Sequence, residues 1–288
     1  MTLARRTVVR GIGLLLVTLS ATSAAHAQAA GAVERMYVLR CGESITKDVS
    51  ANWSPGVNVG VAREFSDNCY LIKHADGWLL WDTGMSDALA KTPEGVLAAS
   101  GLLTLYVKTT LASQLQALNV APSDITRLAI SHFHSDHVGN ANLFSAATLY
   151  IQEPEYDAAF GPDAAKFGFA SKLYDKLAGS KVVKLRGDHD VFGDGSVTII
   201  STPGHTPGHQ SLLVRLPQTG AVVLTGDMVH FQENWDQRRV PARNFDKAQT
   251  LQSMERVAAI LEQHNAKLWI NHDKAQSDAI AHAPAFVR

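Results

Sequence analysis

The chain has 288 residues, of which 46% are hydrophobic and 18% are charged. This composition is too apolar for a disordered chain, and 21 glycines and 10 prolines are too few for a low-complexity or collagen-like sequence. The net charge of −1 offers no basic surplus for phosphate contacts, which disfavours a nucleic-acid partner. Two cysteines cannot build a disulfide scaffold or an all-thiolate metal site, whereas 12 histidines are unusually many. Any bound metal would therefore be held mainly by histidine and carboxylate groups.

Residues 1–27 have the pattern of a signal peptide. Arg5, Arg6 and Arg10 precede an apolar run, and small residues lead to Ala25-His26-Ala27, after which we expect cleavage. The apolar run is shorter than the about 20 residues that a spanning helix needs, so we expect no integral membrane anchor. The Arg-Arg-x-x-x-Arg spacing resembles a twin-arginine signal. We expect a periplasmic or secreted protein, whose net charge changes from −1 to −4 when these three arginines are removed.

Export would place Cys41 and Cys69 in an oxidising compartment, where they can pair. The alternative is two buried free thiols on neighbouring strands. A disulfide requires the two Cα atoms to lie within about 7 Å of each other, and the sequence does not give that distance. Both states stay open at this point.

Strands and helices alternate along the rest of the chain. A strand is expected at 36–40, and a hairpin at 68–74 and 78–82. Residues 42–66 lack a helical period and predict a long loop near a site. Further strands are expected at 127–131, 147–152, 197–201, 210–216, 221–225 and 267–270, and helices at 108–119, 153–160, 163–179 and 245–265. This order fits two sheets packed face to face with helices outside, in one domain spanning 28–288.

The strongest motif begins directly after the strand expected at 127–131. It reads His132-Phe133-His134-Ser135-Asp136-His137. In a loop, His132 and His134 can present imidazoles to one ion, while Asp136 and His137 face a second ion nearby. A single histidine pair on an apolar face would be ordinary core packing, but three histidines and an aspartate at a strand end are not. The pattern predicts a zinc-type metal site.

This His-x-His-x-Asp-His segment resembles the signature of the metallo-β-lactamase superfamily. Four further segments match the same family: Trp81-Asp82-Thr83-Gly84, the Thr-Pro-Gly-His-Thr-Pro-Gly-His run at 202–209, Thr225-Gly226-Asp227 and Ile270-Asn271-His272. The resemblance implies a mixed α/β (α+β) fold, the αββα sandwich. It also implies two metal ions at one edge between the two sheets.

Carried over position by position, the resemblance implies a complete ligand set for two ions. Each ion has three ligands of its own: His132, His134 and His205 for the first, and Asp136, His137 and His272 for the second. Asp227 bridges the two ions. Two Zn²⁺ ions are the expected cofactor, with other divalent transition metals as the alternative.

Three residues near these segments are expected not to be ligands. His209 is assigned a structural role beside the site, and Asp82 is expected to orient a ligating histidine. His189 lies in Gly187-Asp188-His189-Asp190, which has the composition of a surface turn and is assigned no role.

Two metal ions that share a water molecule lower its pKa toward neutrality, so the resemblance implies hydrolysis of an ester-like bond by a bridging hydroxide. Asp136 is expected to carry the proton to the leaving group. Asp227 argues against true β-lactamases, and the short stretch after His272 argues against glyoxalase II. His134 argues against flavin-linked redox relatives, which carry a glutamate there.

Within the family, the sequence is most similar to the N-acyl-homoserine lactonase group. The shared features include Cys41-Gly42-Glu43, the strand at 68–72 and the compact ending after His272. The resemblance implies opening of a lactone ring, that is, quorum quenching. Many of these lactonases carry a tyrosine near the bridging aspartate, where this chain has His230. We predict that His230 is catalytic, with the alternative that it only lines the cleft.

Five side chains are predicted to bind the substrate: Trp53, Phe65, His230, Phe231 and Trp235. The alternative activities on the same site are organophosphate triester hydrolysis and β-lactam or thioester hydrolysis. A non-catalytic zinc-binding protein is disfavoured by the complete ligand set. The expected partner is a small-molecule substrate, and a homodimer is left open.

Overall fold

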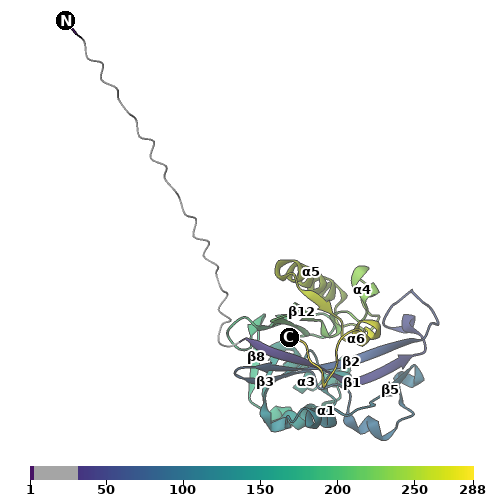
Figure 1. Ribbon diagram of the computed structural model, residues 1–288. Helices are drawn as coiled ribbons and strands as arrows, with labels where there is room; N and C mark the ends of the chain where they lie inside the picture. The colour runs from purple at the N-terminus through teal and green to yellow at the C-terminus, as the bar shows by residue number, and fades with distance from the viewer. Residues whose placement is uncertain (3–31) are drawn as a thin grey trace.

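The structure is a computed structural model that describes residues 1–2 and 32–288. The predicted signal peptide and its cleavage site therefore lie almost entirely outside the described residues. Two β-sheets stacked between helices make up the body of the molecule (Figure 1). Within the described residues, no helix combines the length and the apolar character needed to cross a membrane.

The larger sheet has eight strands. In spatial order they are β4 (Val96–Ala98), β5 (Leu103–Tyr106), β1 (Val33–Thr46), β2 (Arg63–His74), β3 (Gly77–Trp81), β6 (Ile125–Ala129), β7 (Thr148–Gln152) and β8 (Val182–Leu185). The strands from β4 to β3 pair antiparallel, and those from β3 to β8 pair parallel. Because β3 and β6 are parallel, the loops that follow them leave the sheet at the same edge.

The smaller sheet has five strands. In spatial order they are β13 (Lys267–Trp269), β12 (Gly220–Leu224), β11 (Gln210–Leu216), β10 (Val197–Ser201) and β9 (His189–Asp190). Only β12 and β13 pair parallel. His189, expected in a surface turn, instead pairs with Ile199 as part of β9.

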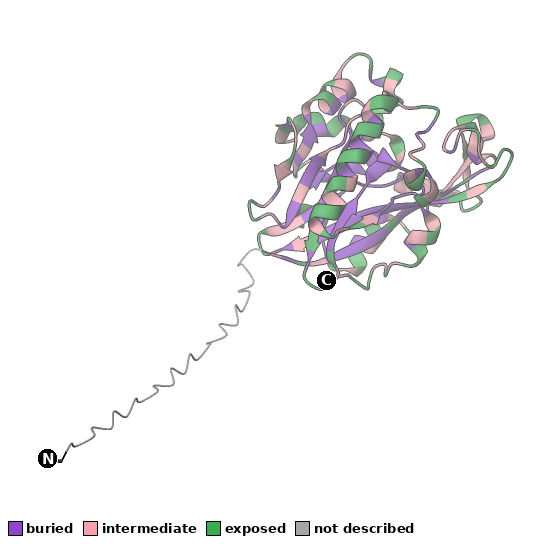
Figure 2. Ribbon diagram, turned by 90° about the horizontal axis from the view of Figure 1, so that it is seen from above, coloured by how far each residue is buried: buried purple, intermediate pink, exposed green. Residues whose placement is uncertain are grey.

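Three hydrophobic cores separate four layers. The first core lies between the larger sheet and the helices α1 (Leu111–Ala117) and α3 (Glu153–Phe160), and the second lies between the two sheets. The third packs the smaller sheet against α5 (Lys247–His264). Successive residues of β2 alternate between cores, with Leu71 in the first and Tyr70 and Ile72 in the second. Figure 2 shows the buried residues concentrated in the strands, with exposed residues on the outer side of the helices. The layers confirm the αββα sandwich.

The boundaries predicted for the long loop at 42–66 are wrong at both ends. β1 continues to Thr46 and β2 begins at Arg63, so only residues 47–62 connect them. Residues 43–46 pair with β2 on one side and with β5 on the other. A β-bulge between Arg40 and Gly42 shifts the register there. In this segment the polar residues Ser44 and Thr46 are buried while Ile45 is exposed, so the sequence lacks the usual alternating pattern of a strand.

The single helix predicted at 163–179 is also wrong. The segment contains three short 3-10 helices, at Ala164–Phe167, Ser171–Leu173 and Asp175–Gly179. Gly168 adopts a left-handed backbone conformation with φ 81°, which ends the first of them. The helix predicted at 245–265 is found as α5, where the Asp246 side chain accepts a hydrogen bond from the backbone N–H of Gln249.

Cys41 and Cys69 form a disulfide between β1 and β2, which decides between the two states left open by the sequence. Both residues are buried, with exposures of 2% and 0%. The bridge joins paired strands that lead toward the edge of the sandwich where the candidate site lies.

Candidate metal centre

The loops after five strands meet at one edge of the sandwich. Asp82 follows β3, and the segment 132–137 follows β6, both in the larger sheet. His205 follows β10, Asp227 follows β12 and His272 follows β13, all in the smaller sheet. All seven predicted ligands therefore lie together, although their positions span 141 residues from His132 to His272.

One group consists of His132, His134, His205 and Asp227, whose ligand atoms lie within 4.8 Å of one another. Nδ1 of His134 lies 2.8 Å from Nε2 of His132 and 3.1 Å from Nε2 of His205. Oδ2 of Asp227 lies 3.8 Å from Nε2 of His132 and 3.5 Å from Nε2 of His205. Three imidazole nitrogens and a carboxylate oxygen thus surround one point.

The second group consists of Asp136, His137 and His272. Oδ1 of Asp227 lies 3.1 Å from Nε2 of His137 and 2.9 Å from Nε2 of His272. Oδ2 of Asp136 lies 3.9 Å from Nε2 of His272. Asp227 therefore directs one carboxylate oxygen toward each group, in the position expected of a bridging ligand.

The residues present fit a pair of divalent metal ions. Nε2 of His137 and Oδ1 of Asp227 are buried and make no hydrogen bond to any described residue. Burial, followed by the neighbouring His137 and His134, holds the pKa of His132 well below its usual value, so this ring is neutral. Burial opposes ionisation of Asp227, but the nearby His272 and His137 outweigh it and hold the pKa of this carboxyl well below its usual range. The neutral ring of His132 beside an ionised carboxylate is the kind of donor set that zinc prefers. Burial lowers the pKa of His137 and His272, but the neighbouring Asp227 outweighs it and raises both, so these two rings would release a proton on binding an ion.

In His137, His272 and His134, the ring nitrogen that faces away from the centre is held by a hydrogen bond. Nδ1 of His137 lies 2.9 Å from Oδ2 of Asp82, as the prediction for Asp82 requires. Nδ1 of His272 donates to the carbonyl oxygen of Ser66 at 2.7 Å, and Nε2 of His134 donates to that of Phe167 at 3.0 Å. Each bond orients its ring so that the other nitrogen can offer a lone pair to the centre. Ser66 and Phe167 act through backbone atoms, so no side-chain motif could have identified them.

His209 contacts the candidate metal centre through the backbone N–H of Asp227. Its Nε2 accepts a hydrogen bond from the backbone N–H of Asp227 at 3.0 Å, while its Nδ1 lies 3.0 Å from the carbonyl oxygen of Thr202. Burial lowers the pKa of His209 to about 3, so the ring is neutral and Nε2 is an acceptor. His209 belongs to none of the groups that could hold a metal ion, in agreement with the structural role expected for it.

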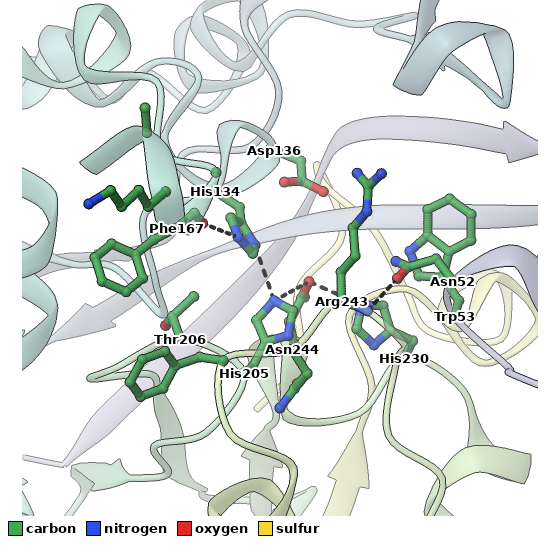
Figure 3. Close-up of a pocket in the computed structure, with 15 residues that line it drawn as sticks. Asn52, Trp53, His134, Asp136, Phe167, His205, Thr206, His230, Arg243 and Asn244 are labelled. Carbon is green, nitrogen blue, oxygen red and sulfur yellow. Dashed lines mark hydrogen bonds and ion pairs between the residues drawn. The ribbon is translucent and has the colours of Figure 1, made fainter. Parts of the chain in front are cut away.

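A cavity of about 630 Å³ opens over the centre. Its floor contains His134, Asp136, His205, Asp227 and His230. Its walls come from three segments that contain no predicted ligand: Asn52 and Trp53, residues 165–168, and residues 243–245 (Figure 3). The backbone N–H groups of Ala242 and Arg243 donate to Asn52, at 2.7 Å to its carbonyl oxygen and 2.8 Å to its Oδ1, which joins two of the walls.

His230 lies between the centre and the cavity. Its Nε2 is 3.2 Å from Oδ2 of Asp227, and its ring stacks on that of His272 with centroids 5.3 Å apart. Its Nδ1 is buried and makes no hydrogen bond to any described residue. His230 also forms a third group with Asp227 and His272 that could hold a metal ion. A possible role of His230 as a metal ligand was not predicted from the sequence.

Of the predicted substrate-binding residues, Trp53 and His230 line the cavity, and the structure places the others elsewhere. Phe65 and Phe231 are buried at 3% and 0% exposure and pack against each other with centroids 5.0 Å apart. Trp235 packs against the core beneath α5. Aromatic residues near the motifs were expected at the cleft, but Phe65 and Phe231 lie in the interior and Trp235 is partly buried against a core. Phe167 and Phe245 supply apolar wall surface instead.

Comparison with known proteins agrees with the metal centre that the geometry indicates. Residues 62–261 match the Metallo-beta-lactamase superfamily. The chain is 33% identical over 264 residues to N-acyl homoserine lactonase AttM of Rhizobium radiobacter, covering 88% of this chain and 98% of the relative. It is also similar to an N-acyl homoserine lactone hydrolase solved with N-hexanoyl-L-homoserine at its catalytic metal centre, with a TM-score of 0.77, 25% identity and coverage of 89% and 100%.

The fold is also shared with AidC, a dizinc quorum-quenching lactonase, with a TM-score of 0.64, 16% identity and coverage of 90% and 97%. The match to the family covers more than half of the chain, and the relatives span it almost completely. The chain therefore belongs to the metallo-β-lactamase superfamily and is a metal-dependent hydrolase.

Proposed function

We propose that residues 28–288 form one exported hydrolase domain, which uses two zinc ions to open the ring of N-acyl-homoserine lactones. The observation that carries this proposal is the placement of Asp227, whose two carboxylate oxygens face two separate groups of ligand atoms at the floor of an open cavity. The lactonase relatives support the substrate class, and the dizinc lactonase supports the metal.

In this proposal His132, His134 and His205 hold one ion, and Asp136, His137 and His272 hold the other. Asp227 would contact both. Two bound zinc ions would acidify a water molecule and polarise the carbonyl oxygen of the lactone. The protein contributes the orienting hydrogen bonds that the ligand rings donate to Asp82, Ser66 and Phe167.

Asp136 is the proposed proton carrier. Its side chain is 33% exposed and lines the cavity, whereas the side chain of Asp227 is 5% exposed. A carboxylate at the cavity floor can accept the proton of the attacking water and deliver it to the ring oxygen as the carbon–oxygen bond breaks. The products are a free carboxylate and a hydroxyl group, as ring opening of a lactone requires.

His230 is the proposed hydrogen-bond donor to the substrate. Its ring lines the cavity beside Asp227, within reach of a carbonyl placed over the centre. A donor at that position stabilises the negative charge that develops on the carbonyl oxygen. Trp53, Phe167 and Phe245 provide apolar surface for the acyl chain on the walls.

The test is a substrate panel with zinc-loaded protein. The panel contains short- and long-chain acyl-homoserine lactones, a phosphotriester, a cephalosporin and S-lactoylglutathione. We expect the highest kcat/KM on an acyl-homoserine lactone and about two zinc ions per chain by metal analysis. Turnover of another class with none of the lactones would contradict the substrate assignment. His132→Ala should abolish turnover, while His189→Ala, in β9 and outside the candidate metal groups, serves as the matched control.

Export is part of the same proposal. We expect the mature protein to begin at Gln28 and to accumulate outside the cytoplasm, as amino-terminal sequencing of fractionated cells would show. Replacing Arg5 and Arg6 by lysine should block export by a twin-arginine route, and unchanged export would assign the protein to another route. The homodimer stays a prediction, to be checked by light scattering of the purified protein.

A further inference from the structure

Glu155 is a fully buried carboxylate in the first turn of α3. Its exposure is 0%, and the first turn of the same helix also contains Glu153, which is only partly buried. A buried carboxylate is unfavourable unless hydrogen bonds replace its contacts with water. Among residues 1–2 and 32–288, Glu155 takes part in no ion pair. Its compensation must therefore come from uncharged donors.

Those donors belong to two segments that carry predicted metal ligands. Oε1 of Glu155 accepts a hydrogen bond from the backbone N–H of Phe133 at 3.0 Å, and Oε2 accepts one from that of Gly208 at 2.9 Å. Phe133 lies between His132 and His134, and Gly208 lies three residues after His205. One side chain thus connects the segments that supply all three histidines of the first ligand group.

Helix α3 packs closely against the segment that contains Gly208. A Cβ atom on Gly208 would lie 2.4 Å from the backbone nitrogen of Glu155, which leaves no room for any side chain there. On the other side, the ring of Phe133 packs against that of Tyr174 with centroids 4.5 Å apart. Both partners of the Glu155 carboxylate are therefore held firmly in place.

Glu155 does not cap its own helix. It occupies the third helical position, where an acidic side chain can bond back to the residue that caps the helix. That residue is Gln152, and no capping hydrogen bond of this kind is found in α3. Both carboxylate oxygens are directed away from the helix and toward the ligand-bearing segments.

We propose that Glu155 is a positioning residue for zinc binding, which sets the distance between the His132–His134 pair and His205 without contacting the ion or the substrate. The inference rests on the ligand set of the proposed function. Since these two hydrogen bonds come from backbone N–H groups of the two segments, the effect of Glu155 on the ion would pass through the placement of the three histidine rings.

The experiment measures zinc affinity of the full-length protein by competition with a chromogenic chelator at pH 8. Glu155→Gln keeps the size of the side chain but replaces one acceptor oxygen with an NH₂ group, which faces an N–H donor. We expect zinc binding about 10- to 100-fold weaker than in the unmodified protein. The absorption bands of the Co²⁺-substituted protein should also shift, because the ligand geometry changes.

The matched control is Glu153→Gln, two residues away on the same helix, where the carboxylate pairs with Arg186. We expect its zinc affinity to stay within about twofold of the unmodified protein, because this pair is at the surface. Glu155→Asp keeps the charge on a shorter side chain and should recover part of the affinity. If Glu155→Gln does not fold, Glu155→Asp is measured against the same criteria.

Unchanged zinc affinity and an unchanged Co²⁺ spectrum in the Glu155 variant would overturn the inference. A general loss of folding would differ from the proposed effect, because it would also lower the unfolding temperature of the metal-free protein. No substrate is present in these measurements, so failure of the lactonase proposal leaves the result intact. Failure of the unmodified protein to bind zinc would instead refute the proposed metal site.

Discussion

The backbone N–H of Asp227 donates a hydrogen bond to Nε2 of His209 at 3.0 Å. Asp227 is the residue whose two carboxylate oxygens face the two ligand groups, and His209 is the second histidine of the Thr-Pro-Gly-His-Thr-Pro-Gly-His segment. The segment therefore contributes twice to the centre. His205 contributes a candidate ligand nitrogen, and His209 fixes the main chain of the central carboxylate.

The first prediction concerns this hydrogen bond. His209→Ala removes the acceptor and leaves the buried N–H of Asp227 unpaired, so we expect zinc affinity and kcat/KM to fall about 10- to 100-fold. The measurements are chelator competition and steady-state kinetics. His209→Gln retains an amide oxygen that can accept from Asp227 and should lose less. Equal losses in both variants would show that the size of the ring, rather than its acceptor, is required.

The second prediction concerns His230. If it donates a hydrogen bond to the reacting oxygen, His230→Ala should lower kcat about 100-fold at unchanged zinc content. His230→Gln, which keeps a donor, should retain more activity. Unchanged kcat and KM would show that His230 only lines the cleft. A loss of zinc from the variant would instead assign His230 to the third group of possible ligands, with Asp227 and His272.

The third prediction concerns the pH dependence of stability. Burial raises the pKa of Glu155 from its ordinary value of 4.5 to about 7. The folded protein thus holds this proton more tightly than the unfolded chain. The stabilisation is fully present below pH 4.5 and is lost as the pH rises through about 7. The size of this loss is roughly 3 kcal/mol.

The measurement is the free energy of unfolding of the metal-free protein in urea at several pH values between 4 and 8. The Glu155→Gln variant lacks the titrating group, so the difference in stability between the two proteins should move in favour of the variant as the pH rises. Taking this difference cancels the contribution of the histidines, which titrate in the same range. A difference that is independent of pH would show that Glu155 does not have a raised pKa.

The fourth prediction concerns the disulfide between Cys41 and Cys69, which closes a loop with a sequence separation of 28. Cross-linking a loop of this length restricts the unfolded chain, so replacing both residues with serine should lower stability by about 3–4 kcal/mol. The loss is measured by urea unfolding of the oxidised protein and of the double variant. Titration of the denatured, unreduced protein should find no free thiol. Equal stabilities would show that the bridge makes no net contribution.

The candidate ligands could be predicted from the sequence because metal binding imposes residue types and spacings that persist in the linear chain. His132, His134, Asp136 and His137 are adjacent in sequence as well as in space. His205, Asp227 and His272 were placed by the resemblance, since their spacing alone does not indicate that three strands end at one edge. Asp82 was predicted for the same reason, and its contact with His137 agrees.

The walls of the cavity could not be predicted in the same way. Whether an aromatic residue faces a cleft or a core depends on the exact strand and loop boundaries, and these were wrong around 42–66 and 163–179. Phe65 lies on β2 rather than in a loop and points into a buried cluster. Phe167 is the last residue of a short helix that Gly168 ends, and it lines the cavity. Glu155 was not identified because a single glutamate on a helix has no distinguishing pattern.

The walls and the floor of the cavity come from different stretches of the chain. Asn52 and Trp53, residues 165–168 and residues 243–245 form the walls, whereas the predicted ligands lie in other segments. Side chains on these three stretches can therefore be exchanged without removing a metal ligand. This separation makes the enzyme a suitable starting point for laboratory evolution, in which libraries at Trp53 and Phe245 would change the substrate range while every predicted metal ligand is kept.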